Sequence, residues 1–244
     1  MSLSDHVHPA AAVDLAILTV EAGGLAALLM RRDDAAAVGG DWALPGAFVH
    51  ADVSLEDTAR RTLAAKANLP GAYVEQLATF GALGRDPRGR VISITYLALI
   101  PVPRLRAATD GRPDLALAPL SVPWAGEAGG PVAAQAPAQA PDGGAPLALA
   151  FDHAEILGQT VRRLRGKIDY APIAFELLPE RFTLRALQEV HEAVLGRTLS
   201  KPPFRRRMLA GGRIAATGDH ESGGAHRPAE LYRRVPPEAA TAPG

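Results

Sequence analysis

Four basic side chains lie close together near the C-terminal end of the sequence, at Lys201, Arg205, Arg206 and Arg207. Such groups neutralise phosphates, and a guanidinium can also bind guanine through two parallel hydrogen bonds. On a helix that begins near Ser200, these side chains would enter or flank a DNA groove. Since Phe204 and Met208 are expected to face inward, at least one arginine is expected only to flank the core. The segment predicts contact with double-stranded DNA; a basic surface used for protein contacts is the alternative.

The elements around this basic segment have the order of a winged-helix domain. Thr183 is a suitable N-cap for a first helix, which a glycine ends, and the basic segment lies in a second helix. Two short strands, 213–217 and 229–234, follow and enclose a glycine-bearing loop. In this loop, or wing, His226 and Arg227 could reach an adjacent groove or phosphate.

Charge is divided unevenly along the chain, although the formal net charge is zero. Residues 1–159 carry 11 basic against 17 acidic side chains, whereas residues 160–234 carry 15 against 8. This asymmetry favours a separate basic module with a polyanionic partner. A solvated basic surface would give the same counts.

The first hundred residues predict a domain of strands and one helix. The stretches Val13 to Val20 and Leu25 to Arg32 are separated by a glycine-containing turn, which is typical of a hairpin. Ser54 is a suitable N-cap for a helix with an apolar row at i, i+4 and i+8. A β-branched run from Val91 to Val102 predicts a further strand. This order is consistent with an α/β sandwich.

The predicted helix and the loop before it resemble the Nudix box, whose pattern is G-x5-E-x7-R-E-U-x-E-E-x-G-U with U aliphatic. The run Trp42-Ala43-Leu44-Pro45-Gly46 and the run Arg61-Thr62-Leu63 fix the alignment. The box positions that match are Arg61, Leu63 and Leu69. The first glycine, the first glutamate and the second glycine are replaced by Ala47, Val53 and Asn68.

The three helical glutamates of the box are also replaced, by Thr62, Ala65 and Lys66. Positions spaced i, i+3 and i+4 share one helix face, where three carboxylates could hold Mg²⁺. Such ions activate water and neutralise the pyrophosphate during hydrolysis. The sequence therefore predicts no catalytic residue, no metal site and no cofactor. A divergent pyrophosphohydrolase acting on ADP-ribose-like nucleotides, with a displaced metal site, is the alternative.

The whole chain resembles the Nudix-related transcriptional regulators of bacteria, the NrtR family. The resemblance covers about residues 10–102 and 148–234, and its most specific part is the run Arg227-Pro228-Ala229-Glu230-Leu231-Tyr232-Arg233. It implies a homodimeric repressor of NAD-metabolism genes that ADP-ribose, or a related NAD or sugar metabolite, releases from operator DNA. Pro202 and Pro203 depart from the usual recognition helix, and Ala47 departs from the usual Gly-Gly.

The resemblance implies that the Nudix-type domain holds this effector. Arg31 and Arg32, at the end of a predicted strand, could pair with its phosphates, and Trp42 or Phe48 could stack on its base. Gly46 would allow close approach of the backbone to a pyrophosphate. For both aromatic side chains, packing beneath the loop is the favoured alternative.

We expect an α+β protein in which residues 1–150 form a degenerate Nudix effector-sensing domain. Within it, a Pro-, Ala- and Gly-rich stretch at about 125–146 is expected to be a mobile surface insertion rather than packed core. A connecting helix over 151–170, a winged-helix domain over 171–236 and a disordered tail over 237–244 would follow.

Composition indicates the compartment. The sequence has no cysteine, which excludes disulfides and thiolate metal sites, and it has no apolar run of the ~20 residues needed to span a bilayer. We expect a cytoplasmic protein without membrane contact. A protein-interaction adaptor, in which both domains have lost their ligands, is a third hypothesis.

Overall fold

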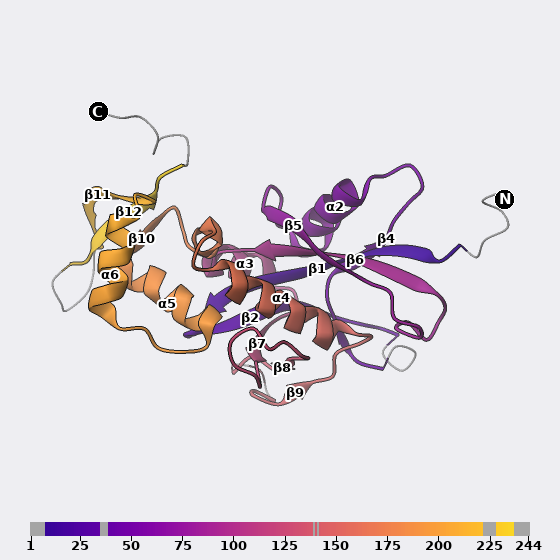
Figure 1. Cartoon of the computed structure of the whole chain (residues 1–244). Coiled ribbons are helices and arrows are strands. Elements are labelled where there is room, and N and C mark those ends of the chain that lie inside the picture. The colour runs from indigo at the N-terminus through magenta and orange to yellow at the C-terminus, as the bar shows by residue number, and fades with distance from the viewer. Residues whose placement is uncertain (1–7, 35–38, 139, 141, 222–227, 237–244) are drawn as a thin grey trace.

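The computed structural model describes residues 8–34, 39–138, 140, 142–221 and 228–236. A nine-stranded mixed sheet forms the centre of the larger part (Figure 1). Its order is β5-β6-β1-β2-β7-β8-β9, while β3 pairs with β2 and β4 pairs with β1. The strands are β1 (Ala10–Glu21), β2 (Gly24–Arg31), β3 (Trp42–Ala43), β4 (Gly46–Phe48), β5 (Tyr73–Phe80), β6 (Val91–Leu99), β7 (Leu115–Ser121), β8 (Ala133–Gln135) and β9 (Pro146–Leu147).

Helices cover both faces of this sheet because its central strands are apolar on both sides. On β1, Val13, Leu15 and Ile17 join the core beneath α2 (Leu55–Ala67) and α3 (Val102–Thr109), whereas Ala16 and Leu18 join the core beneath α4 (His153–Lys167). Successive side chains of a strand point to opposite faces, so one continuous apolar run serves two cores. The predicted hairpin of β1 and β2 and the predicted helix α2 are confirmed.

The predicted cap of α2 is also present. The Ser54 hydroxyl accepts the Asp57 backbone N–H at 3.1 Å, and Asn68 ends the helix in the left-handed conformation with φ 51°. Capping satisfies a backbone donor that the first helical turn leaves without a partner. The cap fixes the residue at which α2 begins, and it therefore helps to fix the direction in which the Lys66 side chain points.

The prediction of a mobile insertion outside the packed core at about 125–146 is wrong for much of that stretch. The strands β8 and β9 extend the sheet beyond β7, and Val132, Ala134 and Ala136 are buried. Gly158 of α4 lies so close that a Cβ atom there would be 1.8 Å from the Gly130 carbonyl oxygen. Small residues permit this close packing, although the same composition is typical of linkers.

The C-terminal part is a winged helix. It contains the 3₁₀ helix η2 (Pro172–Leu177), β10 (Arg181–Thr183), α5 (Leu184–Leu195), α6 (Lys201–Ala210), β11 (Ile214–His220) and β12 (Glu230–Arg234). The strand order is β10-β12-β11. As the sequence predicts, Thr183 accepts the Ala186 N–H at 3.1 Å and Gly196 ends α5 with φ 66°. Residues 222–227, with most of the predicted wing loop, and the predicted tail 237–244 lie outside the described residues.

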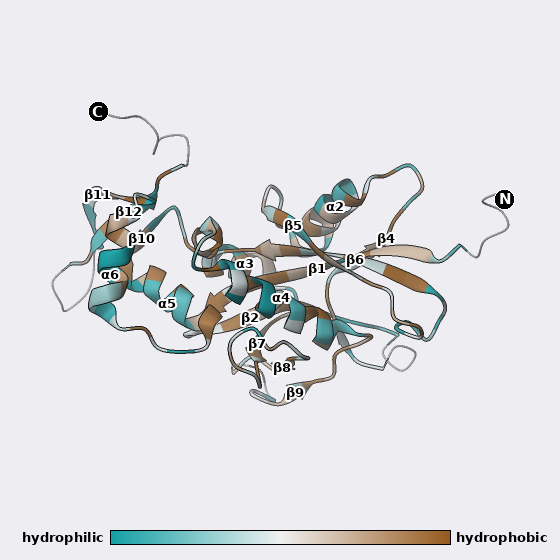
Figure 2. Cartoon of the chain, in the orientation of Figure 1, coloured by the Kyte–Doolittle hydropathy of each residue, from teal (hydrophilic) through white to brown (hydrophobic). Residues whose placement is uncertain are grey.

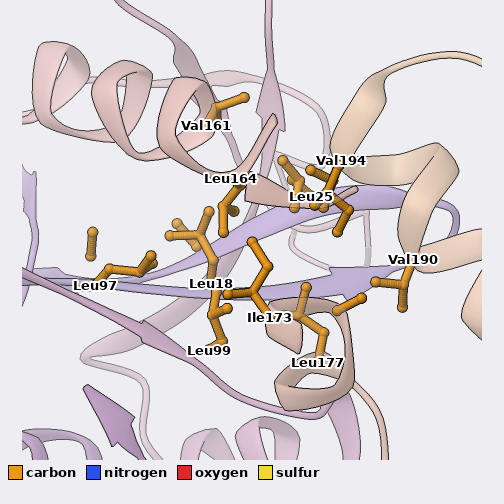
Figure 3. Close-up of a cluster of buried hydrophobic side chains, with 14 of the residues drawn as sticks. Leu18, Leu25, Leu97, Leu99, Val161, Leu164, Ile173, Leu177, Val190 and Val194 are labelled. Carbon is orange, nitrogen blue, oxygen red and sulfur yellow. The ribbon is translucent and has the colours of Figure 1, made fainter. Parts of the chain in front are cut away.

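One apolar core joins the sheet to the winged helix. Leu18 of β1 and Leu25 of β2 lie in the same buried cluster as Leu164 of α4, Ile173 of η2 and Val194 of α5 (Figure 3). The sequence predicts a separate basic module, whereas the structure packs this module directly on the sheet. A displacement of α4, or of the part of β1 and β2 that packs in this core, would therefore disturb the packing of α5.

A buried arginine strengthens the same junction. Arg165 of α4 donates hydrogen bonds to the carbonyl oxygens of Val194, Trp124 and Gly126, at 2.9, 3.0 and 2.9 Å. Its guanidinium also lies 4.7 Å from the centroid of the Trp124 ring. Three segments of the chain thus meet at one side chain.

None of the helices that the structure describes is long and apolar enough to cross a bilayer.

Candidate functional site

A cavity of about 670 Å³ lies where β1, β4, the loop after β2, the loop before β6 and the N-terminal end of α4 meet. Four of the five predicted effector-binding residues line it, namely Arg31, Arg32, Gly46 and Phe48. The fifth, Trp42, lines a second cavity of about 800 Å³ and packs partly against the core. The favoured packing interpretation agrees with this position of Trp42. It is wrong for Phe48, which is 52% exposed.

Close backbone packing explains the glycine at position 46. A Cβ atom there would lie 2.3 Å from Asp14 Oδ1 and 2.9 Å from the Val13 carbonyl oxygen. Any side chain would therefore displace β4 from β1, with which it pairs. Gly46 shapes the floor of the cavity, and its neighbour Ala47 also lines it.

The three replaced glutamate positions occupy different environments on α2. The buried Thr62 hydroxyl donates to the Thr58 carbonyl at 2.7 Å, and Ala65 is exposed. Lys66 alone of the three lines the cavity, and its ammonium donates a hydrogen bond to the Gly46 carbonyl. Burial lowers the pKa of Lys66, and nearby Arg32 lowers it further against the opposing effect of Asp14. Lys66 is thus a cation in a partly desolvated position.

A buried network of polar side chains forms one wall of the cavity. Arg85 donates two hydrogen bonds to Asp152, at 2.9 and 2.6 Å, and a longer one of 3.4 Å to Asp14. The Ser93 hydroxyl donates to Asp14 at 2.6 Å. Burial alone would raise the pKa of Asp14, but His153, Ser93 and Arg85 together hold it below its usual range.

His153 joins this wall at the start of α4. Its Nδ1 accepts the Leu44 backbone N–H at 3.0 Å, so any ring proton is on Nε2. Nε2 is buried, lies 3.8 Å from Asp14 Oδ2 and has no hydrogen-bond partner among the described residues. Asp152 and His153 therefore fix the N-terminal end of α4 against the cavity.

The sequence predictions missed Asp14, Arg85 and His153. Asp14 had a visible signal, because it is the one charged residue in the apolar run from Val13 to Val20. Arg85 and His153 had none, since the hydrogen bonds from Arg85 join residues 67 and 71 positions apart. Among the described residues, no group of three or more His, Asp or Glu side chains is arranged to hold a metal ion.

The arginines on the two loops of the cavity are held by aspartates. Arg32 donates two hydrogen bonds of 2.7 Å to Asp34, and Arg88 pairs with Asp86 at 2.8 Å. Both guanidinium groups lie over the Phe151 ring, at 5.2 and 5.3 Å from its centroid. In the part of the chain that the structure describes, Arg31 and Lys66 are the lining cations without an ion pair.

Four of the six predicted DNA-binding side chains lie on α6, which is largely hydrophilic (Figure 2). Lys201, Arg205, Arg206 and Arg207 are all exposed, and Phe204 is buried beneath them. Arg207 pairs with Asp169 at 3.0 Å and lies over the Phe204 ring, so it is the arginine that flanks the core. The other two predicted residues, His226 and Arg227, lie outside the described residues.

The similarity of this chain to known proteins shows its family. The family model described as the NrtR DNA-binding winged helix domain matches residues 174–234. The ADPR-responsive transcriptional repressor NtrR of Acinetobacter baylyi is 34% identical over 232 residues, which cover 94% of this chain and 84% of the relative. The chain belongs to the NrtR family. The predicted resemblance is confirmed.

A solved structure of an NrtR protein supports the fold. The crystal structure of Shewanella oneidensis NrtR complexed with a 27mer DNA superposes with a TM-score of 0.73 at 31% identity. The match covers 94% of this chain and 95% of that one. The predicted α+β class, a Nudix-type sandwich followed by a winged helix, is therefore confirmed.

Part of this NrtR-family chain is also similar to an enzyme. An ADP-ribose pyrophosphatase of Methanocaldococcus jannaschii is 31% identical over 107 residues. That match covers 44% of this chain and 60% of the enzyme.

Proposed function

We propose that this protein is a homodimeric transcriptional repressor that binds operator DNA through its winged helix and is released when ADP-ribose or a related metabolite occupies the cavity. The observation that carries the proposal is the position of α4. Its first residue, His153, lines the cavity, and its later residue Arg165 is hydrogen-bonded to the end of α5. A ligand in the cavity and the winged helix thus both contact α4, so binding of the ligand could change the orientation of the winged helix.

DNA contact is assigned to the exposed face of α6. Lys201, Arg205 and Arg206 are exposed there and have no ion pair among the described residues, so phosphates or base edges could bind them directly. Arg207 contributes less, because Asp169 already neutralises it. Two chains related by a twofold axis would present two α6 helices to half-sites about one DNA turn apart.

Effector binding is assigned to the cation-lined cavity. Arg31, Arg32 and Lys66 face a space that would accept a nucleoside diphosphate sugar, and exposed Phe48 offers a ring for stacking. In this proposal residues 1–150 form the sensor, 151–170 the connection and 171–236 the DNA-binding part. To reverse repression, the effector must favour the non-binding geometry by about 2 to 3 kcal/mol, which changes occupancy roughly 30- to 150-fold.

Catalysis is excluded from the proposal because the helix that would supply three carboxylates has Thr62, Ala65 and Lys66. The second candidate, a divergent pyrophosphohydrolase, is favoured by the similarity to the archaeal ADP-ribose pyrophosphatase. Four aspartates also line the cavity, Asp14, Asp33, Asp34 and Asp86. At least three of them are engaged by arginine.

Two assays separate these functions. A mobility shift with duplexes from the upstream region of the protein's own gene, at two salt concentrations, should show binding that weakens steeply with salt. Incubation of ADP-ribose with Mg²⁺ or Mn²⁺ should release no AMP. Release of AMP at ordinary enzymatic rates, without any DNA shift by the folded protein, would favour the hydrolase. If the folded protein neither shifts DNA nor releases AMP, the protein-interaction adaptor becomes the better explanation.

A further inference from the structure

On the face of α2 that lines the cavity, this chain has a positively charged side chain where the Nudix box has a carboxylate. Nudix enzymes place carboxylates on this helix to hold metal ions, and those ions neutralise the diphosphate. Here the position that lines the cavity is a lysine, and the other two positions offer a buried hydroxyl and a methyl group. These residues do not fit a divalent cation, because an ammonium repels it and Thr62 already bonds to Thr58.

The cavity still requires positive charge if it is to hold a diphosphate. Its arginines are largely committed: Arg32 to Asp34, Arg88 to Asp86, and Arg85 to Asp152. An anionic ligand would have to compete with these carboxylates, which are bound at 2.6 to 2.8 Å. Lys66 has no carboxylate partner within the described residues.

The ammonium of Lys66 is already oriented for such a ligand. Its one hydrogen bond within the described residues is to the neutral carbonyl of Gly46, which leaves two of its three N–H donors for a ligand. Gly46 itself is held by its close approach to Asp14, so the carbonyl that orients Lys66 is fixed. A cation held by a neutral acceptor in a partly buried place is stabilised by an incoming anion.

We propose that the Lys66 ammonium takes the place of the metal ions and binds the diphosphate of the effector directly, so that the cavity takes a nucleoside diphosphate sugar without a divalent cation. The inference rests on the proposed effector site and adds the group that replaces the metal. Arg31 is the other lining cation without an ion pair among the described residues. It is exposed at the end of β2 and would contact the ligand at the entrance of the cavity. A charged hydrogen bond of this kind accounts for a tenfold or larger change in affinity.

The test is calorimetric titration of ADP-ribose into the full chain, once with EDTA and once with Mg²⁺. The wild type should bind equally well in both. Lys66→Met should bind at least about tenfold more weakly in both, whereas Lys66→Arg should keep most of the affinity. Arg60→Met is the matched control, because Arg60 lies on the same helix, is exposed and does not line the cavity. It should bind like the wild type.

Foldedness is checked by operator binding, which all three variants should retain in the absence of ADP-ribose. The inference is overturned if the wild type needs Mg²⁺ to bind, or if Lys66→Met binds ADP-ribose as well as the wild type. It is also overturned if the Arg60 control loses affinity as much as Lys66→Met does. If the wild type binds no ADP-ribose under either condition, the proposed effector itself is wrong, which is a different result from either of these.

Discussion

Arg85 donates two hydrogen bonds to Asp152, and this pair joins the loop before β6 to the N-cap residue of α4. The side chains of Arg85 and Asp152 are 4% and 12% exposed, so the pair is largely buried, and it connects the cavity wall to the helix that continues toward the winged helix. A change in the cavity wall can therefore displace α4 and, through it, α5.

Replacement of Arg85 should destabilise the protein strongly. Arg85→Met leaves the buried carboxylate of Asp14 and the partly buried carboxylate of Asp152 without their cation, which costs about 3 to 5 kcal/mol. Urea denaturation measures the free energy of unfolding. The exposed pair of Arg60 and Glu56 is the control, and Arg60→Met should change stability by less than about 1 kcal/mol. Similar losses in the two variants would contradict the role given to Arg85.

The more conservative variant Asp152→Asn tests whether ADP-ribose binding and DNA binding are coupled through this pair. It keeps the side-chain volume but removes the charge that attracts Arg85, so the N-terminal end of α4 is held less firmly. We expect ADP-ribose to bind, yet to weaken operator binding several-fold less than in the wild type. The readout is the ratio of DNA affinities with and without ADP-ribose. An unchanged ratio would show that coupling does not pass through this pair.

The arginines of α6 should differ in their contribution to DNA binding. Arg205→Ala and Arg206→Ala should each weaken binding and lower the slope of log affinity against log salt by about 1. Arg207→Ala should have a smaller effect, since Asp169 pairs with that side chain. Arg185, exposed on α5 and paired with Glu189, gives the control. Equal effects from Arg185→Ala and Arg206→Ala would count against α6 as the DNA-binding helix.

The winged helix should lose stability in mild acid because of His191. This side chain is buried on α5 against Phe204, and burial is the main cause that holds its pKa below the usual value. The unfolded chain therefore takes up the proton first as pH falls, and stability is lost from about pH 6.5 down to the folded pKa. Melting curves at pH 7.5 and 5.5 should differ more for the wild type than for His191→Gln. The exposed His50→Gln should behave like the wild type, and an unaltered pH dependence in His191→Gln would refute this explanation.

Local patterns predicted the elements whose signals lie within a few residues of each other. Ser54 and Thr183 could be recognised as caps, and Gly196 as a stop, because each acts on its own turn of helix. The strands β8 and β9 were missed, since alanine, proline and glycine are typical of linkers. Ala134 is instead fully buried in the part of the sheet that these strands extend.

The candidate site was predictable where it follows a family motif and unpredictable where the fold creates it. Arg31, Arg32 and Gly46 lie close together in sequence as well as in space, and the Nudix-like order predicted them. The network of Arg85, Asp152 and His153 depends on a loop and a helix start that tertiary packing brings together. No local pattern marks such a network.

The most direct test of the account is fluorescence anisotropy of an operator duplex, titrated with the full chain in the presence and absence of ADP-ribose. Roughly 30-fold weaker DNA binding is predicted with saturating ADP-ribose, together with intact ADP-ribose recovered afterwards. Equal DNA affinity in both titrations, or conversion of the ADP-ribose to AMP during the measurement, would contradict the account.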